Sequence, residues 1–137
     1  MSVKTNGSVE SVREAAAELK EEHQMLATMV QKLKETSETS PIEQVVELLQ
    51  ALFPRLEAHF AKEERPGGLY DRMGATAHPK SDALQALVDD HYRILSSIRS
   101  AKIGTEQNQK AETIAYAHTL AEWLKDHEQR EHALAAS

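Results

Sequence analysis

Histidines recur at intervals of 36, 32 and 36 residues along this chain of 137 residues, at His23, His59, His91 and His127. The last two follow the first two by 68 residues, so the second half of the sequence repeats the first. Neutral imidazoles supply nitrogen ligands to transition metals. A lone histidine is more often a hydrogen-bonded core residue, but four in one register indicate a metal site to which both halves contribute.

Two of these histidines are followed four residues later by a glutamate, in the pairs His59/Glu63 and His127/Glu131. Positions i and i+4 of a helix lie about 40° apart, one turn above the other, so each pair projects from a single face. Carboxylates can bridge two cations and offset their charge. Four imidazoles and two carboxylates are too many for one tetrahedral ion. They predict two metal ions that share both glutamates, with two histidines on each ion and coordination positions left open.

The elements that must position these side chains are predicted to be helices. Ala, Leu, Glu, Gln and Lys are abundant, whereas the chain has 5 glycines and 4% aromatic residues, a composition typical of helices. No segment alternates with a period of two residues over a useful length, so strands are not expected. Apolar residues recur at helical spacing around each of the four histidines, which places the predicted ligands on buried faces.

Start signals divide the sequence into four helices. The first is predicted to begin near Ser11, and the second at Ser40-Pro41, where the serine would cap the helix and the proline would occupy its first position. The third is predicted to begin at Pro79 and the fourth at Thr105. The connections between these long helices are short. Together these signals predict an all-α, antiparallel up-down-up-down four-helix bundle.

Prolines mark two further features. Pro54 lies inside the second helix and predicts a kink there, because a proline removes a backbone hydrogen bond. Pro66-Gly67-Gly68 is expected to end that helix, and the stretch from there to His78 is predicted to be the longest irregular segment. This segment would cover the end of the bundle at which the four histidines converge within a band of roughly 8 Å.

Length and charge bound the class of protein. We expect a single domain over residues 1–137, with residues 1–10 as a mobile lead. A net charge of −6 argues against a nucleic-acid partner, and no apolar run reaches the length of a membrane span. The sequence shows no signal peptide, and its 0 cysteines exclude disulfides and thiolate ligands. These features predict a cytoplasmic protein with no membrane partner and do not identify a protein partner.

The arrangement H…HxxxE…H…HxxxE over four helices resembles the hemerythrin-like, or HHE cation-binding, family, and the resemblance covers nearly the whole chain. It implies a non-heme centre of two iron ions, joined by an oxo or hydroxo bridge, that binds dioxygen or related small ligands. Carried over by position, the iron ligands would be His23, His59, His91 and His127, with Glu63 and Glu131 as bridges.

The chain departs from the oxygen-carrying members of that family. Those members have a fifth histidine one turn after the third-helix ligand, where this chain has Leu95, and an aspartate at a longer spacing where this chain has Glu131. The pattern is closer to the branch with four histidines and two glutamates. Tyr70 or His78, both in the segment that would cover the site, could fill the position left by Leu95.

Other polar residues near the predicted ligands are assigned away from the metals. His118 and His132 lie about 180° and 140° around the fourth helix from His127, so neither is predicted to be a ligand. Glu22 and Glu64 are adjacent to ligands but point about 100° away. We expect these two glutamates either to support a ligand from behind or to lie at the surface.

Three functions remain open. The first is a di-iron protein that senses, stores or handles dioxygen or nitric oxide. The second is an enzyme that decomposes peroxide or reduces nitric oxide at the same centre. The third is a metal-stapled bundle, holding zinc or manganese, with a structural or storage role. The sequence does not separate a binder from an enzyme, because both need open coordination positions and neither needs a further motif.

Overall fold

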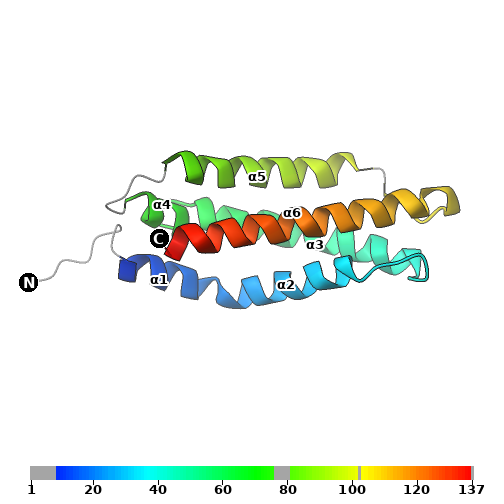
Figure 1. The fold of residues 1–137 in the computed structure, drawn as a ribbon, viewed down its shortest axis with the longest axis horizontal. Helices are drawn as coiled ribbons and strands as arrows, with labels where there is room; N and C mark the ends of the chain where they lie inside the picture. The colour runs from blue at the N-terminus through cyan, green and yellow to red at the C-terminus, as the bar shows by residue number, and fades with distance from the viewer. Residues whose placement is uncertain (1–8, 76–80, 102, 137) are drawn as a thin grey trace, which may run out of the picture.

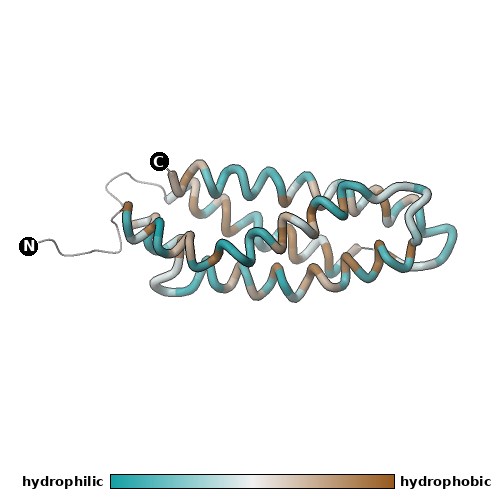
Figure 2. Tube along the Cα trace, turned by 90° about the horizontal axis from the view of Figure 1, so that it is seen from below, coloured by the Kyte–Doolittle hydropathy of each residue, from teal (hydrophilic) through white to brown (hydrophobic). Residues whose placement is uncertain are grey.

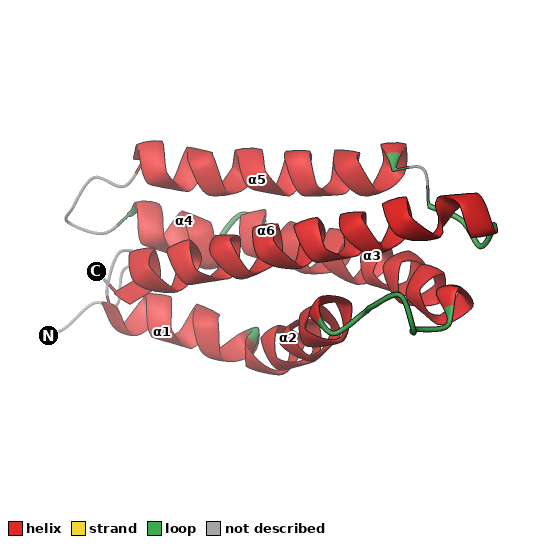
Figure 3. Cartoon of the chain, turned by 45° about the vertical axis from the view of Figure 1, so that its right-hand side comes forward, coloured by secondary structure: helices red, strands yellow, loops and turns green. Residues whose placement is uncertain are grey.

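The computed structural model describes residues 9–75, 81–101 and 103–136. Their elements are α1 (Val9–Glu18), α2 (Lys20–Lys34), α3 (Ile42–Glu64), α4 (Leu69–Gly74), α5 (Ser81–Ser100), the 3-10 turn η1 (Gln107–Gln109) and α6 (Lys110–Ala136). Every element in these residues is helical, which confirms the all-α prediction (Figure 3). None of the described helices combines the length and the apolar character that a membrane crossing requires.

The four long helices α2, α3, α5 and α6 extend along the long axis of the molecule (Figure 1). Among them, α2 and α5 each pack against both α3 and α6. The shorter helices α1 and α4 pack against each other at one end, where α6 also finishes. Hydrophobic and hydrophilic residues alternate along each long helix at short intervals (Figure 2), as expected for helices that bury one face.

The first predicted helix is interrupted at Leu19, so the prediction of one continuous helix was wrong. The backbone N–H of Leu19 donates to the carbonyl of Ala16 at 3.1 Å, three residues back, and its φ and ψ are −98° and 0°. No glycine or proline marks this position. Leu19 is buried with Val12 and Ala15 in a cluster that also contains residues of α4. The break lies where α1 packs against α4, a tertiary contact that no local sequence signal indicates.

The segment predicted to be irregular contains α4. Gly67 has a φ of 76°, in the left-handed region that favours glycine, and it separates α3 from this short helix. Burial of Leu69, Tyr70 and Met73 then holds α4 against the end of the bundle. His78 and Pro79, the predicted start of the third helix, lie outside the described residues.

Helix boundaries differ from their predicted positions by a few residues. The N-cap of α3 is Pro41 rather than Ser40, whose hydroxyl oxygen instead accepts a hydrogen bond from the N–H of Ser37 at 2.9 Å. Helix α3 continues past Pro54, where a kink was predicted, to its end at residue 64. Thr105 does not cap α6, because η1 intervenes and α6 begins only at residue 110.

Most buried apolar residues in the described part of the chain belong to one of two clusters. The larger apolar cluster consists of Met29, Leu33, Val45, Leu49, Leu52, Leu56, Phe60, Ile94, Ile98, Ala117, Leu120, Ala121 and Leu124. The smaller apolar cluster consists of Val12, Ala15, Leu19, Leu69, Tyr70, Met73 and Leu87. Positions between the two clusters carry the buried histidines and glutamates, which are His59, Glu63, His91, His127 and Glu131. On α5, for example, His91 lies between Leu87 of the smaller cluster and Ile94 of the larger one.

Candidate metal centre

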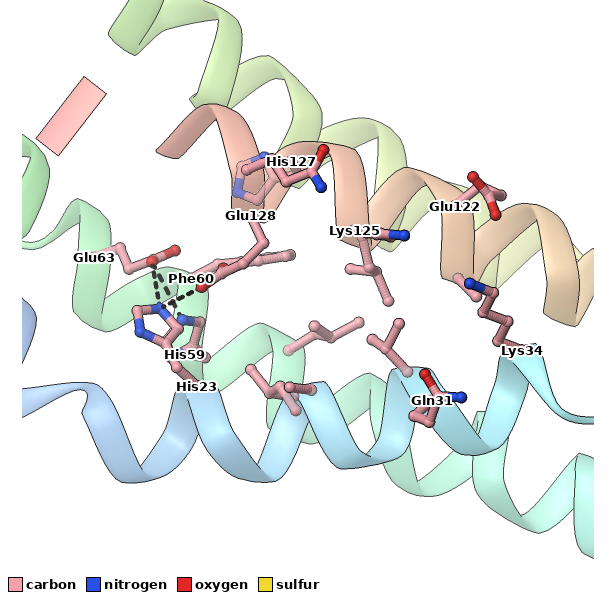
Figure 4. Close-up of a pocket in the computed structure, with 17 residues that line it drawn as sticks. His23, Gln31, Lys34, His59, Phe60, Glu63, Glu122, Lys125, His127 and Glu128 are labelled. Atoms are coloured by element: carbon pink, nitrogen blue, oxygen red, sulfur yellow. Dashed lines mark hydrogen bonds and ion pairs between the residues drawn. The ribbon is translucent and has the colours of Figure 1, made fainter. Parts of the chain in front are cut away.

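The six predicted ligands lie together in the layer between the two apolar clusters. One group consists of the buried residues Glu63, His91, His127 and Glu131, whose ligand atoms lie within 4.8 Å of one another. A second group consists of His23, His59 and Glu63, within the same limit. Glu63 belongs to both groups, so two adjacent subsites share a carboxylate. Figure 4 shows His23, His59 and Glu63 side by side, with His127 on the facing helix.

The two oxygens of Glu63 face different histidines. Oε2 lies 3.2 Å from Nε2 of His59 and 3.4 Å from Nε2 of His23. Oε1 lies 3.3 Å from Nε2 of His91. The carboxylate therefore spans the two subsites, as a bridge between two cations would.

Glu131 divides its oxygens in the same way. Its Oε1 lies 3.3 Å from Nε2 of His23, and its Oε2 lies 3.5 Å from Nε2 of His127. His23 and His59 thus share one side of the two carboxylates, and His127 lies on the other side with His91. This division matches a centre with two histidines on each ion and both glutamates shared.

Two features of these side chains suit the binding of cations. Oε1 of Glu131 is buried and makes no hydrogen bond of good geometry among the described residues, although Nε2 of His23 lies 3.3 Å away. The Nε2 atoms of His91 and His127 approach to 3.1 Å, where at most one can donate to the other. Cations placed among these atoms would satisfy the carboxylate and both lone pairs, so the residues present fit a metal pair.

Tyr70 of α4 also reaches this layer. Its hydroxyl donates to Oε2 of Glu131 at 2.7 Å and lies 2.9 Å from Nε2 of His91. Leu95, which stands where oxygen carriers have a fifth histidine, is partly buried and packs against the larger apolar cluster. Two side chains were proposed to fill that position. The hydroxyl of Tyr70 lies among the ligand atoms, and His78 lies outside the described residues.

Three of the four histidines have a carboxylate behind the ring, within hydrogen-bond distance of Nδ1. These pairs are His59 with Glu22 (3.3 Å), His91 with Glu64 (2.6 Å) and His127 with Asp90 (3.1 Å). Each carboxylate comes from a neighbouring helix. Such partners fix the ring orientation and raise the basicity of a metal-ligating histidine.

This set of carboxylates was only partly foreseen. Glu22 and Glu64 were predicted either to support ligands or to lie at the surface, and they lie behind two of the rings. Asp90 was not predicted, although it follows Glu22 by 68 residues, the interval of the repeat. Because Asp90 corresponds to Glu22 in the repeat, the sequence could have predicted that it supports a histidine in the same way.

The histidines and glutamates of this layer shift one another's pKa values. Burial opposes a charged imidazole, but close contacts with Glu131 and Glu63 outweigh it and raise the pKa of His23 to about 10. The same competition raises the pKa of His59 and of His127. Burial opposes a charged Glu63, but hydrogen bonds from the histidines hold its pKa well below the ordinary value. A cation must therefore displace protons from the imidazoles to bind here.

Two further histidines of the described residues lie outside this layer. His118 is exposed, as predicted, and its Nε2 lies 2.7 Å from the carbonyl oxygen of Thr36. His132 is also exposed, and its Nε2 lies 2.8 Å from Oε1 of Glu128. Its ring lies 6.0 Å from the ring of His23, centroid to centroid, so His132 borders the centre.

A cavity of about 280 Å³ leads to the centre between α2 and α6. In Figure 4, His23 and His59 lie at one end of this cavity, and Gln31 and Lys34 at the other. Apolar side chains line the part between these ends, including Leu26, Ala27, Val30, Leu56, Ala121 and Leu124. A small molecule without charge could reach the centre along these walls.

Comparison with known families supports the same interpretation. A family model described as "Hemerythrin HHE cation binding domain" matches residues 14–135, a span that contains all six predicted ligands. Comparison with curated proteins and with solved structures gives no significant match. With its histidines and glutamates clustered where a cation can be held, the chain belongs to the hemerythrin HHE cation-binding domain family.

Proposed function

We propose that this protein is a non-heme di-iron protein that binds, senses or stores dioxygen or nitric oxide. The observation that supports it best is the division of both bridging carboxylates between two sets of histidines. One ion would be held by His23 and His59, the other by His91 and His127, and both would share Glu63 and Glu131.

Two imidazoles and two carboxylate oxygens on each ion would leave coordination positions open for an exogenous ligand. Iron, when bound, supplies reversible redox chemistry and affinity for diatomic ligands. The protein's own side chains prepare the site. Phe60 stacks on the ring of His91, with centroids 3.7 Å apart and an interplanar angle of 8°, and shields it from water. Glu64 holds the same ring from its outer nitrogen.

The cavity between α2 and α6 favours a small ligand over a purely structural role. Dioxygen and nitric oxide are uncharged and little larger than a water molecule, which needs about 10–15 Å³ of such space. A cavity of about 280 Å³ is therefore ample for their passage. Its apolar walls suit an uncharged diatomic better than a hydrated ion. A metal-stapled bundle, with zinc or manganese and a structural or storage role, would not need this route.

An enzyme that decomposes peroxide or reduces nitric oxide is the second candidate, and Tyr70 favours it. Its hydroxyl holds a proton 2.7 Å from Glu131, inside the layer of ligands. Reduction of either substrate consumes protons, and a phenol at this position could deliver one.

We also propose a bundle topology and a cellular location for the protein. The break at Leu19 divides one long predicted helix into α1 and α2. If the two are counted together, the helices correspond to an up-down-up-down four-helix bundle. We place the protein in the cytoplasm, and its net charge of −6 supports the absence of a nucleic-acid partner.

Anaerobic reconstitution of the metal-free protein with ferrous iron tests the proposal. We expect two iron ions per chain and a spectrum that changes reversibly between dioxygen and vacuum. Sustained turnover of hydrogen peroxide or nitric oxide would instead support the enzyme. A chain that takes up no iron and retains one tightly bound zinc ion would contradict both.

A further inference from the structure

The 68-residue repeat is broken at two positions beside the centre. Phe60 and Glu64 in the first half correspond to Glu128 and His132 in the second. In the first half both residues contact His91. Phe60 stacks on its ring, and a carboxylate oxygen of Glu64 lies 2.6 Å from its Nδ1. The second half replaces this apolar cover and acidic support with a carboxylate and an imidazole, which are both metal ligands.

The replaced pair lies on the solvent side of His23. The side chains of His132 and Glu128 are 68% and 39% exposed, and that of His23 is 16% exposed. The side chains of the other three predicted histidine ligands are at most 4% exposed. An ion that approaches from solvent on this flank therefore meets His132 and Glu128 before it meets the buried carboxylates.

These three side chains are close enough to hold one ion. Their ligand atoms lie within 4.8 Å of one another. Oε1 of Glu128 lies 2.8 Å from Nε2 of His132 and 3.8 Å from Nε2 of His23. An exposed i,i+4 pair such as Glu128/His132 is by itself a common surface feature. The difference here is the third ligand, His23, which is itself part of the centre.

We propose that Glu128 and His132 form a metal-uptake site that captures a divalent transition-metal ion and passes it to His23. Nε2 of His23 lies 3.8 Å from Glu128 on the outer side. On the inner side it lies 3.4 Å from Glu63 and 3.3 Å from Glu131. One ring nitrogen ligates one ion at a time, so the ion moves inward by exchanging Glu128 for the buried carboxylates while His23 stays bound.

The uptake site rests on the two-metal centre proposed above, and the rate of loading separates the two. The probe is Co²⁺, added to metal-free full-length protein in a stopped-flow absorbance experiment. The test variant is Glu128→Ala/His132→Ala. The control is His118→Ala/Glu122→Ala, which removes an exposed histidine and glutamate at the same i,i+4 spacing on α6 and makes the same change in charge.

We expect the test variant to load about ten-fold more slowly than wild type, an increase of about 1.4 kcal/mol in the barrier. The control should load at the wild-type rate, and all three proteins should finally hold two ions.

Equal rates for the test and control variants would overturn the uptake site. A test variant that holds fewer than two ions would also overturn it, because the pair would then ligate the centre itself. If wild type holds fewer than two ions, the proposed centre fails instead. Single His132→Ala repeats the test with less perturbation of the helix.

Discussion

The hydroxyl of Tyr70 lies 2.7 Å from Oε2 of Glu131, although Tyr70 belongs to α4 and not to the four long helices. Burial and the charges of Glu63 and Glu131 raise the pKa of Tyr70, so it remains a protonated donor. The hydroxyl oxygen of Tyr70 also lies 2.9 Å from Nε2 of His91. It therefore occupies space among the ligand atoms of one subsite.

We expect Tyr70→Phe to retain two metal ions, because all six predicted ligands are unchanged, but to bind azide more tightly. Removal of the hydroxyl vacates the position in which a small anion would bind. An increase in azide affinity of about ten-fold corresponds to about 1.4 kcal/mol. Spectrophotometric titration of the iron-loaded protein measures it. Tyr116→Phe is the control, since that hydroxyl contacts Ser97 at 2.7 Å instead. Unchanged azide affinity in Tyr70→Phe would refute the assigned role.

Glu131→Gln removes the negative charge of one shared carboxylate while it preserves the size of the side chain. We expect the metal content, measured by elemental analysis, to fall from two ions per chain to one or none, because both subsites lose an anionic oxygen. Glu122→Gln, an exposed substitution on the same helix, should retain both ions. Equal metal contents in the two variants would show that Glu131 is not a bridge.

Glu64 should affect the metal without touching it. Its Oε2 lies 2.6 Å from Nδ1 of His91, and loss of such a partner typically lowers metal affinity about 10–100-fold. We expect a decrease of that size for Glu64→Gln in competition with a chelator. Glu57→Gln provides the comparison, because Glu57 is an exposed residue of α3 that pairs with Arg99 at 3.3 Å. The prediction fails if both variants bind metal as tightly as wild type.

The stability of the metal-free protein should fall as the pH rises above neutrality. The pKa of His23 is raised from 6.5 to about 10, so the stabilisation from its proton is complete below 6.5 and is lost as the pH rises through 10. The pKa of Glu63 is lowered from 4.5, so its contribution is present above 4.5 and is lost under acid. Both contributions are complete between pH 4.5 and pH 6.5, so the stability should be greatest in that range.

Cations displace the same protons, so their stabilising effect should grow with pH over this range. We expect the difference in melting temperature between metal-loaded and metal-free protein to increase from about pH 6 to about pH 9. Calorimetry of both forms across the range checks it. A metal-free protein whose melting temperature rises over this interval would contradict the assigned ionisation of the histidines.

Access to the centre can be tested by narrowing the cavity. Ala27 lines it on α2, and Ala27→Phe should slow the association of nitric oxide with the iron-loaded protein without changing its metal content. Stopped-flow mixing measures the rate. Ala111→Phe places the same ring at an exposed position near the start of α6 and should have no effect. If both variants bind nitric oxide at the wild-type rate, the ligand takes another route.

Local spacing explains what could be predicted from sequence. His59 and Glu63 share a helix face because of the helical repeat alone, and the adjacent leucines show that this face is buried. Asp90 is different, because it is adjacent to His91 in the sequence but contacts His127 on another helix. Its role depends on how α5 and α6 pack against each other. The spacing of residues within one helix gives no information about that packing.

Tyr70 shows a second limit of the sequence. Its approach to the centre depends on α4, a helix of 6 residues that is held by burial against other elements. Helices this short are not stable by themselves. The apolar residues of α4 lie in a segment with glycine and proline, where the local signals favour irregular structure. Its contacts with α1, α3 and α5 distinguish this segment from a loop.

The layer of histidines and glutamates divides the hydrophobic interior into two separate cores, the larger and smaller apolar clusters. Without cations, we expect the smaller core, which is built mainly from α1 and α4 and has apolar contacts with α5 and α6, to open before the larger one. Ligands for each ion come from different helices, so bound cations would tie these helices together across that layer. Occupancy would then determine whether the molecule unfolds in one cooperative step or loses its α1–α4 end first. Amide hydrogen exchange in α4 would therefore report on metal binding, even though none of the six predicted ligands lies in that helix.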